Sequence, residues 1–204
     1  IQDVNAELAE SFGMKKPQGA LVAKVLDDSP AAEAGFEVGD IVIRYDGEYI
    51  RYSSDLPPMV GLSKVGESVP VEIIRHGKKK TLKVTIARLP DEDVIKTGSG
   101  KPDEPARSNA LNVRVRDLTD EQREEYDLED HGVIVHEIQP GPAQQAGIRK
   151  GDIIALINNI RVKDREHFQE IVSNLPADKS IPVLIQRRGG PIFLALKLDE
   201  TEDS

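Results

Sequence analysis

The chain has 204 residues, a length that allows one or two domains, and it contains neither Trp nor Cys. Hydrophobic residues make up 38%, enough for compact cores, and the low aromatic content of 4% favours small domains over one large enzyme body. The missing Cys excludes disulfides, thiolate metal sites and Cys nucleophiles. The 27 basic and 36 acidic residues leave a net charge of −9 without a basic stripe, which argues against nucleic acid as a partner.

An internal repeat runs through the chain. Residues 30–41 recur as residues 142–153, an offset of 112 (142 − 30) that also holds further downstream. Upstream, residues 19–22 match residues 132–135 at an offset of 113 (132 − 19). Such self-similarity indicates two copies of one structural unit.

The residues between the two copies have the composition of a linker. Residues 91–107 are polar, rich in Pro and Gly, and show no hydrophobic periodicity, so we expect a flexible connection. As a flexible coil it would span on the order of 23 Å. The sequence therefore predicts one domain over residues 1–90 and a second over residues 108–204.

The second copy shows its first elements clearly. Alternating apolar and polar residues over 111–118 predict a half-buried strand. Thr119, with Gln122 three positions later, has the pattern of a capping box and predicts the start of a short helix. Gly132 precedes a second predicted strand over residues 133–138.

The later elements of this copy are further strands and two helices. A short helix is predicted over residues 143–146, and a strand over residues 152–157 follows. Asp164 is the expected cap of a longer helix, and residues 181–187 and 192–198 form the expected closing hairpin. The predicted fold class is mainly β with short helices (α+β), as a small barrel or sandwich.

The segments Ala-Gly-Phe-Glu-Val-Gly-Asp-Ile (residues 34–41) and Ala-Gly-Ile-Arg-Lys-Gly-Asp-Ile (residues 146–153) resemble those of PDZ domains, specifically the circularly permuted bacterial type. Two such domains in tandem, with the stretches at residues 8–14 and 19–22, resemble the C-terminal half of the HtrA/Do family of periplasmic serine proteases. The resemblance covers nearly the whole chain.

The resemblance implies a peptide-binding regulatory region that recruits C-terminal or unfolded polypeptide segments in periplasmic protein quality control. It implies two further partners, the protease domain of the same parent chain and other copies in a homo-oligomer, and it implies no cofactor. In this family the second module often serves assembly. Two alternatives stay open: a scaffold without a protease domain, and the PDZ pair of a membrane-embedded metalloprotease.

The peptide site that the resemblance implies in the second domain lies between a strand and a helix. An extended peptide adds to the strand, and amides at its head hold the terminal carboxylate. Asn112 stands where the family has Gly, and Asn tolerates a left-handed backbone well. The helix residues either shape the ligand pocket or fill the core. The expected site residues are Ala110, Leu111, Asn112, Val113, Arg114, Val115, Phe168, Ile171 and Val172.

The first domain is expected to bind peptide poorly in this chain. Its corresponding helix residues are Leu56, Met59 and Val60. Aligning Asp3 with Asp117, an offset of 114 (117 − 3), places Ile1 opposite Val115, so the strand is cut short and the carboxylate loop is missing. Because Ile1 is not an initiator Met, the chain is interpreted as a fragment or a processed form.

The sequence predicts no catalytic or metal site. No serine stands near a plausible base, and the four histidines lack metal-ligand spacing on one face: His76, His131, His136 and His167. No apolar run is long enough to span a membrane, and no signal peptide is present. Residues 78–80, three lysines, are interpreted as a solvated hairpin tip, and Asp40 and Asp152 as parts of tight turns entering strands.

Overall fold

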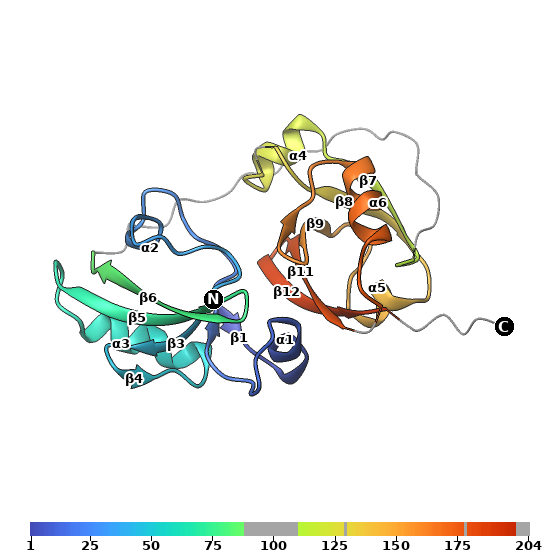
Figure 1. Cartoon of the computed structure of the whole chain (residues 1–204). Helices are drawn as coiled ribbons and strands as arrows, with labels where there is room; N and C mark the ends of the chain where they lie inside the picture. Colours follow the sequence, from blue (N-terminus) through green and yellow to red (C-terminus); the bar gives the residue numbers. More distant parts are fainter. Residues whose placement is uncertain (88–109, 129, 178, 199–204) are drawn as a thin grey trace. The chain divides into compact units, whose positions relative to one another are not determined.

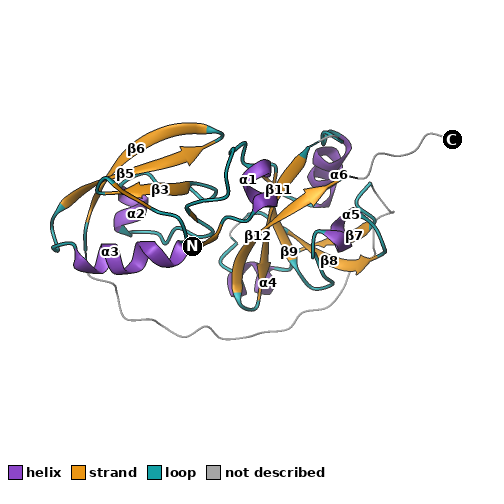
Figure 2. Cartoon of the chain, turned by 90° about the horizontal axis from the view of Figure 1, so that it is seen from below, coloured by secondary structure: helices purple, strands orange, loops and turns teal. Residues whose placement is uncertain are grey.

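The computed structural model describes residues 1–87, 110–128, 130–177 and 179–198. The chain divides into two compact units, Ile1–Glu92 and Asp93–Ser204, and each unit contains one six-stranded antiparallel sheet (Figure 1). The helices are short pieces at the ends and flanks of the strands (Figure 2). The predicted fold class, mainly β with short helices, is confirmed.

The sheet of the first unit has the strand order β1-β2-β3-β5-β6, with β4 paired to β3. Strands β1 and β6 therefore form its edges. The elements are β1 (Gln2–Asp3), α1 (Ala6–Ser11), β2 (Ala20–Leu21), α2 (Pro30–Glu33), β3 (Ile41–Tyr45), β4 (Glu48–Tyr49), η1 (Ser53–Asp55), α3 (Leu56–Leu62), β5 (Ser68–Arg75) and β6 (Lys78–Thr85).

The second unit repeats this plan with the order β7-β8-β9-β11-β12 and with β10 paired to β9. Strand β7 is an edge strand, as β1 is in the first unit. The elements are β7 (Val113–Asp117), α4 (Asp120–Glu125), β8 (Val133–Ile138), α5 (Pro142–Gln145), β9 (Ile153–Ile157), β10 (Ile160–Arg161), α6 (Arg165–Ser173), β11 (Ser180–Arg187) and β12 (Gly190–Lys197).

Local sequence signals set the helix starts of the second unit. Thr119 accepts a hydrogen bond from the Gln122 backbone N–H at 3.2 Å while the Gln122 side chain accepts from the Thr119 N–H, so the predicted capping box is confirmed. Asp164 caps α6 by accepting from the His167 N–H at 2.7 Å. Helix α5 begins one residue earlier than expected, at Pro142, whose fixed φ suits a first helical turn.

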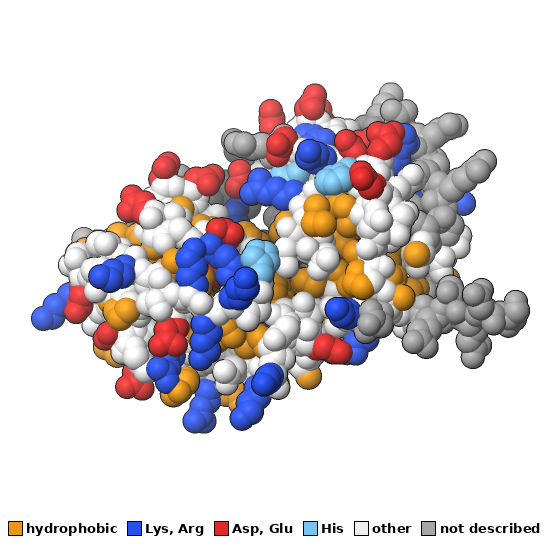
Figure 3. Space-filling view, viewed as in Figure 1, with side chains coloured by type: hydrophobic (Ala, Val, Ile, Leu, Met, Phe, Trp, Pro, Cys, Tyr) orange, Lys and Arg blue, Asp and Glu red, His pale blue; other side chains and the backbone are white. Residues whose placement is uncertain are grey.

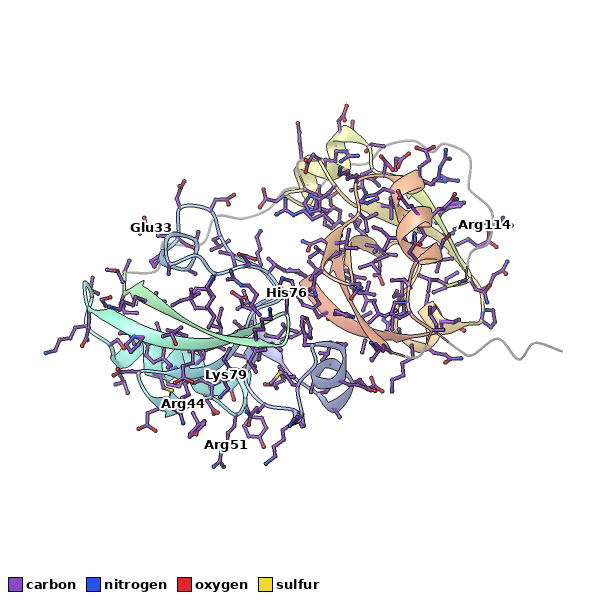
Figure 4. The ribbon with its side chains drawn as sticks, in the orientation of Figure 1. Glu33, Arg44, Arg51, His76, Lys79 and Arg114 are labelled. Carbon is purple, nitrogen blue, oxygen red and sulfur yellow. The ribbon has the colours of Figure 1, made fainter. Side chains whose placement is uncertain are left out.

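The interpretation of residues 78–80 as a hairpin tip is wrong. Arg75 pairs with Lys78, so the turn consists of His76 and Gly77, both with positive φ. A turn of this kind needs only two residues, and the lysines therefore begin strand β6. They are exposed along that edge of the sheet. Figure 3 shows Lys and Arg side chains gathered on this unit, and Figure 4 labels Lys79 among them.

Each unit contains an ion pair between a buried aspartate and an arginine. The aspartate stands directly before the strand that follows the small helix, and the arginine ends the first strand of the closing hairpin. Asp152 accepts from Arg187 Nε at 2.7 Å and from Nη2 at 2.6 Å. In the first unit Arg75 makes the same two bonds to Asp40, each at 2.7 Å. Asp40 is only 1% exposed and Asp152 only 3%. Hydrogen bonding to these carboxylates raises the pKa of both arginines.

These aspartates thus do more than enter a strand from a tight turn. The Asp152 carboxylate also accepts from the Arg149 N–H at 2.8 Å, while Arg187 donates to the Gly147 carbonyl at 3.1 Å. The pair therefore ties the loop after α5 to the end of β11. The sequence repeat contains both arginines, but their role was not recognised from it.

We expect Arg187→Met to lower the free energy of unfolding of the second unit by on the order of 3 kcal/mol, because the substitution leaves a buried carboxylate without its counter-charge. Urea unfolding of the full chain, followed through the NMR amide signals of β9, measures this. Arg188→Met is the matched control, since Arg188 is exposed and makes no polar contact within the described residues. Equal losses in the two variants would contradict a role for the ion pair.

Candidate functional site: the edge of strand β7

Strand β7 hydrogen-bonds to β8 on one side, and within the described residues no strand pairs with its other side. Such an edge presents backbone donors and acceptors that another extended segment can use. Helix α6 contacts β7 on the core side of the sheet. The predicted strand and helix therefore lie together, as the site requires.

The inward side chains of β7 and α6 form part of one hydrophobic core. Val113 and Val115 are each 1% exposed, and the three α6 residues singled out from the sequence are equally inaccessible: Phe168 at 0%, Ile171 at 6% and Val172 at 3%. All five side chains fill the core of the unit. A role for the α6 residues in contacting a ligand stays a prediction.

The head of β7 is shaped by Asn112. Its φ is 57°, so the left-handed backbone expected there is present. Because of this turn, β7 begins at Val113 and not at Leu111, as the alternation had suggested; Leu111 is buried and Ala110 exposed. Asn112 Nδ2 donates to the Pro140 carbonyl at 3.0 Å, and the Asn112 carbonyl accepts from the Gln139 N–H at 2.9 Å.

Gly141 makes room for this arrangement. A Cβ atom at position 141 would lie 2.5 Å from Asn112 Nδ2 and 3.1 Å from Asn112 Cβ, far inside ordinary contact distances. The backbone of Gly141 is thus packed directly against the Asn112 side chain. The conformation of the β7 head depends on a glycine 29 residues later (141 − 112).

The tail of β7 is fixed to α6 by a side chain. Asp117 Oδ1 accepts from the Arg165 backbone N–H at 2.7 Å, at the first residue of the helix. In the first unit Asp3 Oδ1 accepts from the Ser53 N–H at 2.6 Å. The alignment of Asp3 with Asp117 is therefore confirmed, and in both units this aspartate holds the edge strand to the segment that faces it.

The outward face of β7 is basic. Arg114 donates to Glu137 Oε2 at 3.1 Å, and Arg116 Nη2 lies 2.9 Å from His136 Nε2. Burial and the charge of Arg116 lower the pKa of His136, so the neutral ring accepts the hydrogen bond. Arg116 has no carboxylate within ion-pairing distance among the residues that the structure describes.

The corresponding helix in the first unit is more open. Leu56, Met59 and Val60 are partly buried and pack against the core, whereas Leu62 at the end of α3 is 87% exposed. Its edge strand, β1, has two residues, compared with five in β7.

No group of three His, Asp or Glu side chains could hold a metal ion within residues 1–87, 110–128, 130–177 and 179–198. His131 Nδ1 lies 3.4 Å from Asp130 Oδ1. Burial of the His131 ring is the main cause that lowers its pKa, and the charge of Arg161 lowers it further. No helix in the described part of the chain has the length and apolar character to cross a membrane.

We expect Gly141→Ala to displace the Asn112 side chain and alter the head of β7, at a cost of about 1–3 kcal/mol in the free energy of unfolding. NMR amide shifts of residues 110–115 report the displacement. Gly189→Ala serves as the control, because no atom lies within 4 Å of a Cβ there and its φ is not positive. If the two variants left the signals of residues 110–115 equally unchanged, the packing of Gly141 on Asn112 would not shape the loop.

Comparison with known proteins assigns both units to one family. A family model described as "PDZ domain" matches residues 4–86 and again residues 110–198, which leaves only short segments outside the two matches. The matched segments are thus both PDZ domains, and a serine-protease domain is not among the domains matched.

Similar curated proteins carry the name "Probable periplasmic serine endoprotease DegP-like". The protein from Pseudomonas putida (strain W619) is 46% identical over 202 residues, and that from Hahella chejuensis is 44% identical over 203 residues. Each alignment covers 98% of this chain but 42% of the relative, so the chain spans less than half the length of these proteins. The family resemblance supports a periplasmic location.

Solved structures with similarity include the "HtrA-type protease AlgW with decapeptide", at 26% identity and a TM-score of 0.38, covering 44% of this chain and 28% of that one. The HtrA3 PDZ domain bound to a phage-derived ligand matches at 25% identity and a TM-score of 0.37, over 43% of this chain and 81% of that one. These TM-scores lie below 0.5 and add nothing to the assignment. On the two family matches, this chain belongs to the PDZ domain family and carries two PDZ domains in tandem.

Proposed function

We propose that the second PDZ domain binds the C-terminal segment of an extended polypeptide, which adds as a strand to the open edge of β7. The observation that carries this proposal is the combination of an edge strand with a left-handed turn at its head, at Asn112. Backbone amides in such a turn can converge on a terminal carboxylate. The ladder of β7 then supplies main-chain hydrogen bonds to the rest of the ligand.

The side chains around β7 fit an apolar last residue. Residues opposite one another on an antiparallel pair project to the same face, so a ligand residue opposite Val113 projects towards α6. The surroundings there are aliphatic and aromatic. We propose Ala110 to Val115 as the strand side of the site and Phe168, Ile171 and Val172 as the helix side; Leu56, Met59 and Val60 have the equivalent place in the first domain.

For the whole protein, we propose that the chain is the regulatory region of a DegP-like periplasmic serine endoprotease. Similarity to such proteins along 98% of the chain supports this. In that role the PDZ pair recruits unfolded substrates to the protease domain and helps to assemble a homo-oligomer. We also propose domain limits of 1–90 and 108–204 with a linker at 91–107, which lies outside the described residues.

Matched peptides test the carboxylate site. The full chain should bind a free-acid peptide ending in an apolar residue with a Kd on the order of micromolar, about −8 kcal/mol, and should bind the same peptide with an amidated end at least tenfold more weakly. Isothermal titration calorimetry measures both. The reason is that amidation removes the charge that the amides at the head of β7 are proposed to hold.

Gly141→Ala assigns the binding to the second domain, because it changes only that loop, and Gly189→Ala is again the matched control. The first substitution should weaken free-acid binding and the second should leave it unchanged. Equal affinity for free-acid and amidated peptides would show that no carboxylate loop operates at Asn112.

A further inference from the structure

Strand β7 alternates two aliphatic and two basic residues. Val113 and Val115 are buried, while Arg114 and Arg116 each follow one of them and project from the opposite face of the sheet. In Figure 4, Arg114 is labelled on the side of the second unit where β7 lies in Figure 1. An added strand would therefore run beside a row of arginines on one face and beside the apolar core on the other.

The proposed binding mode fixes the register of that added strand. Its carboxylate lies at the turn before Val113, so the last residue stands opposite Val113 and the chain runs antiparallel to β7. The penultimate residue then stands opposite Arg114, and the fourth residue from the end stands opposite Arg116. Because residues opposite one another share a face, these two ligand side chains project towards the guanidinium groups.

The charges on this face are not balanced within the described residues. Glu137 is the one carboxylate paired with either arginine, and both partners of that pair are partly exposed, at 39% for Arg114 and 45% for Glu137. Arg116 contacts a neutral imidazole. In these two contacts each guanidinium uses one terminal nitrogen, and this group carries further N–H donors.

Arg116 has no basic counterpart in the first domain. With the offset of 114, Arg116 corresponds to Gln2 (116 − 114) in the first domain. The whole chain has a net charge of −9, whereas two of the five residues of β7 are positively charged arginines. The difference between Arg116 and Gln2 points to a property of the second copy, here a preference for anionic side chains.

We propose that the second PDZ domain selects polypeptide ends that carry Asp or Glu at the penultimate and fourth-from-last positions. This inference rests on the proposed function and names its ligand class. The partly exposed arginine side chains attract carboxylates through a partly solvated contact, so each acidic residue contributes modestly. We expect about a fivefold gain in affinity for each correctly placed acid, and a smaller gain as salt screens the charges.

A set of free-acid peptides of equal length and with the same apolar last residue tests the inference by calorimetry on the full chain. One peptide carries Asp at the second and fourth positions from the end, a second carries Asn there, and a third carries Lys. A fourth peptide moves the two Asp residues to the third and fifth positions, which face the other side of β7. The expected order is Asp tightest, Asn intermediate and Lys weakest, with the shifted peptide no better than Asn.

Two further peptides carry Asp at only one of the two positions and Asn at the other. Arg116→Gln should reduce the advantage of Asp over Asn at the fourth position and leave that at the second position intact. Arg188→Gln is the control, since it removes one positive charge from an exposed turn. Equal binding of the Asp, Asn and Lys peptides, or an equal effect of the two variants, would overturn the inference while the proposed function stands. If none of the free-acid peptides bound, the proposed function itself would fail, and the inference with it.

Discussion

The open edge of β7 is the constraint around which the second domain is arranged. An edge strand must be paired, protected or used, because its outer donors and acceptors otherwise attract other chains. Here the head of the strand is shaped by Asn112 packed on Gly141, and its tail is held to α6 by Asp117. Both ends are therefore fixed while the middle stays accessible, which is the arrangement that strand addition needs.

The opposite edges of the two sheets are protected. Strand β6 presents lysines along most of its exposed length, and charged side chains on an edge oppose strand pairing. Strand β12 begins with Gly190 and Pro191, and Pro lacks the N–H that a new ladder would need. The repeated pairs Asp40–Arg75 and Asp152–Arg187 hold the hairpins that contain these edges. Of the two strands that end each strand order, β1 or β7 is thus the one without such protection, and β7 is the longer of these two.

Local sequence signals predicted much of this arrangement. The caps at Thr119 and Asp164 depend on residues three positions apart, and the left-handed backbone at Asn112 was expected from the residue type. The repeat was found by comparing the two copies with each other. The ion pairs were missed because Asp152 and Arg187 are 35 residues apart and meet only once the hairpin has folded. The spacing of Phe168, Ile171 and Val172 predicted one apolar face of a helix. Such a face serves core packing and a ligand pocket equally well. The lysines of β6 were misplaced because the two-residue turn leaves them on the strand.

The central claim is that a polypeptide end becomes an additional antiparallel strand on β7. Intermolecular NOEs between an isotope-labelled full chain and an unlabelled free-acid peptide measure this directly. The account predicts cross-strand NOEs from the backbone protons of Val113 and Val115 to the last and third-from-last peptide residues. NOEs confined to another surface, such as the α3 side of the first domain, would contradict it.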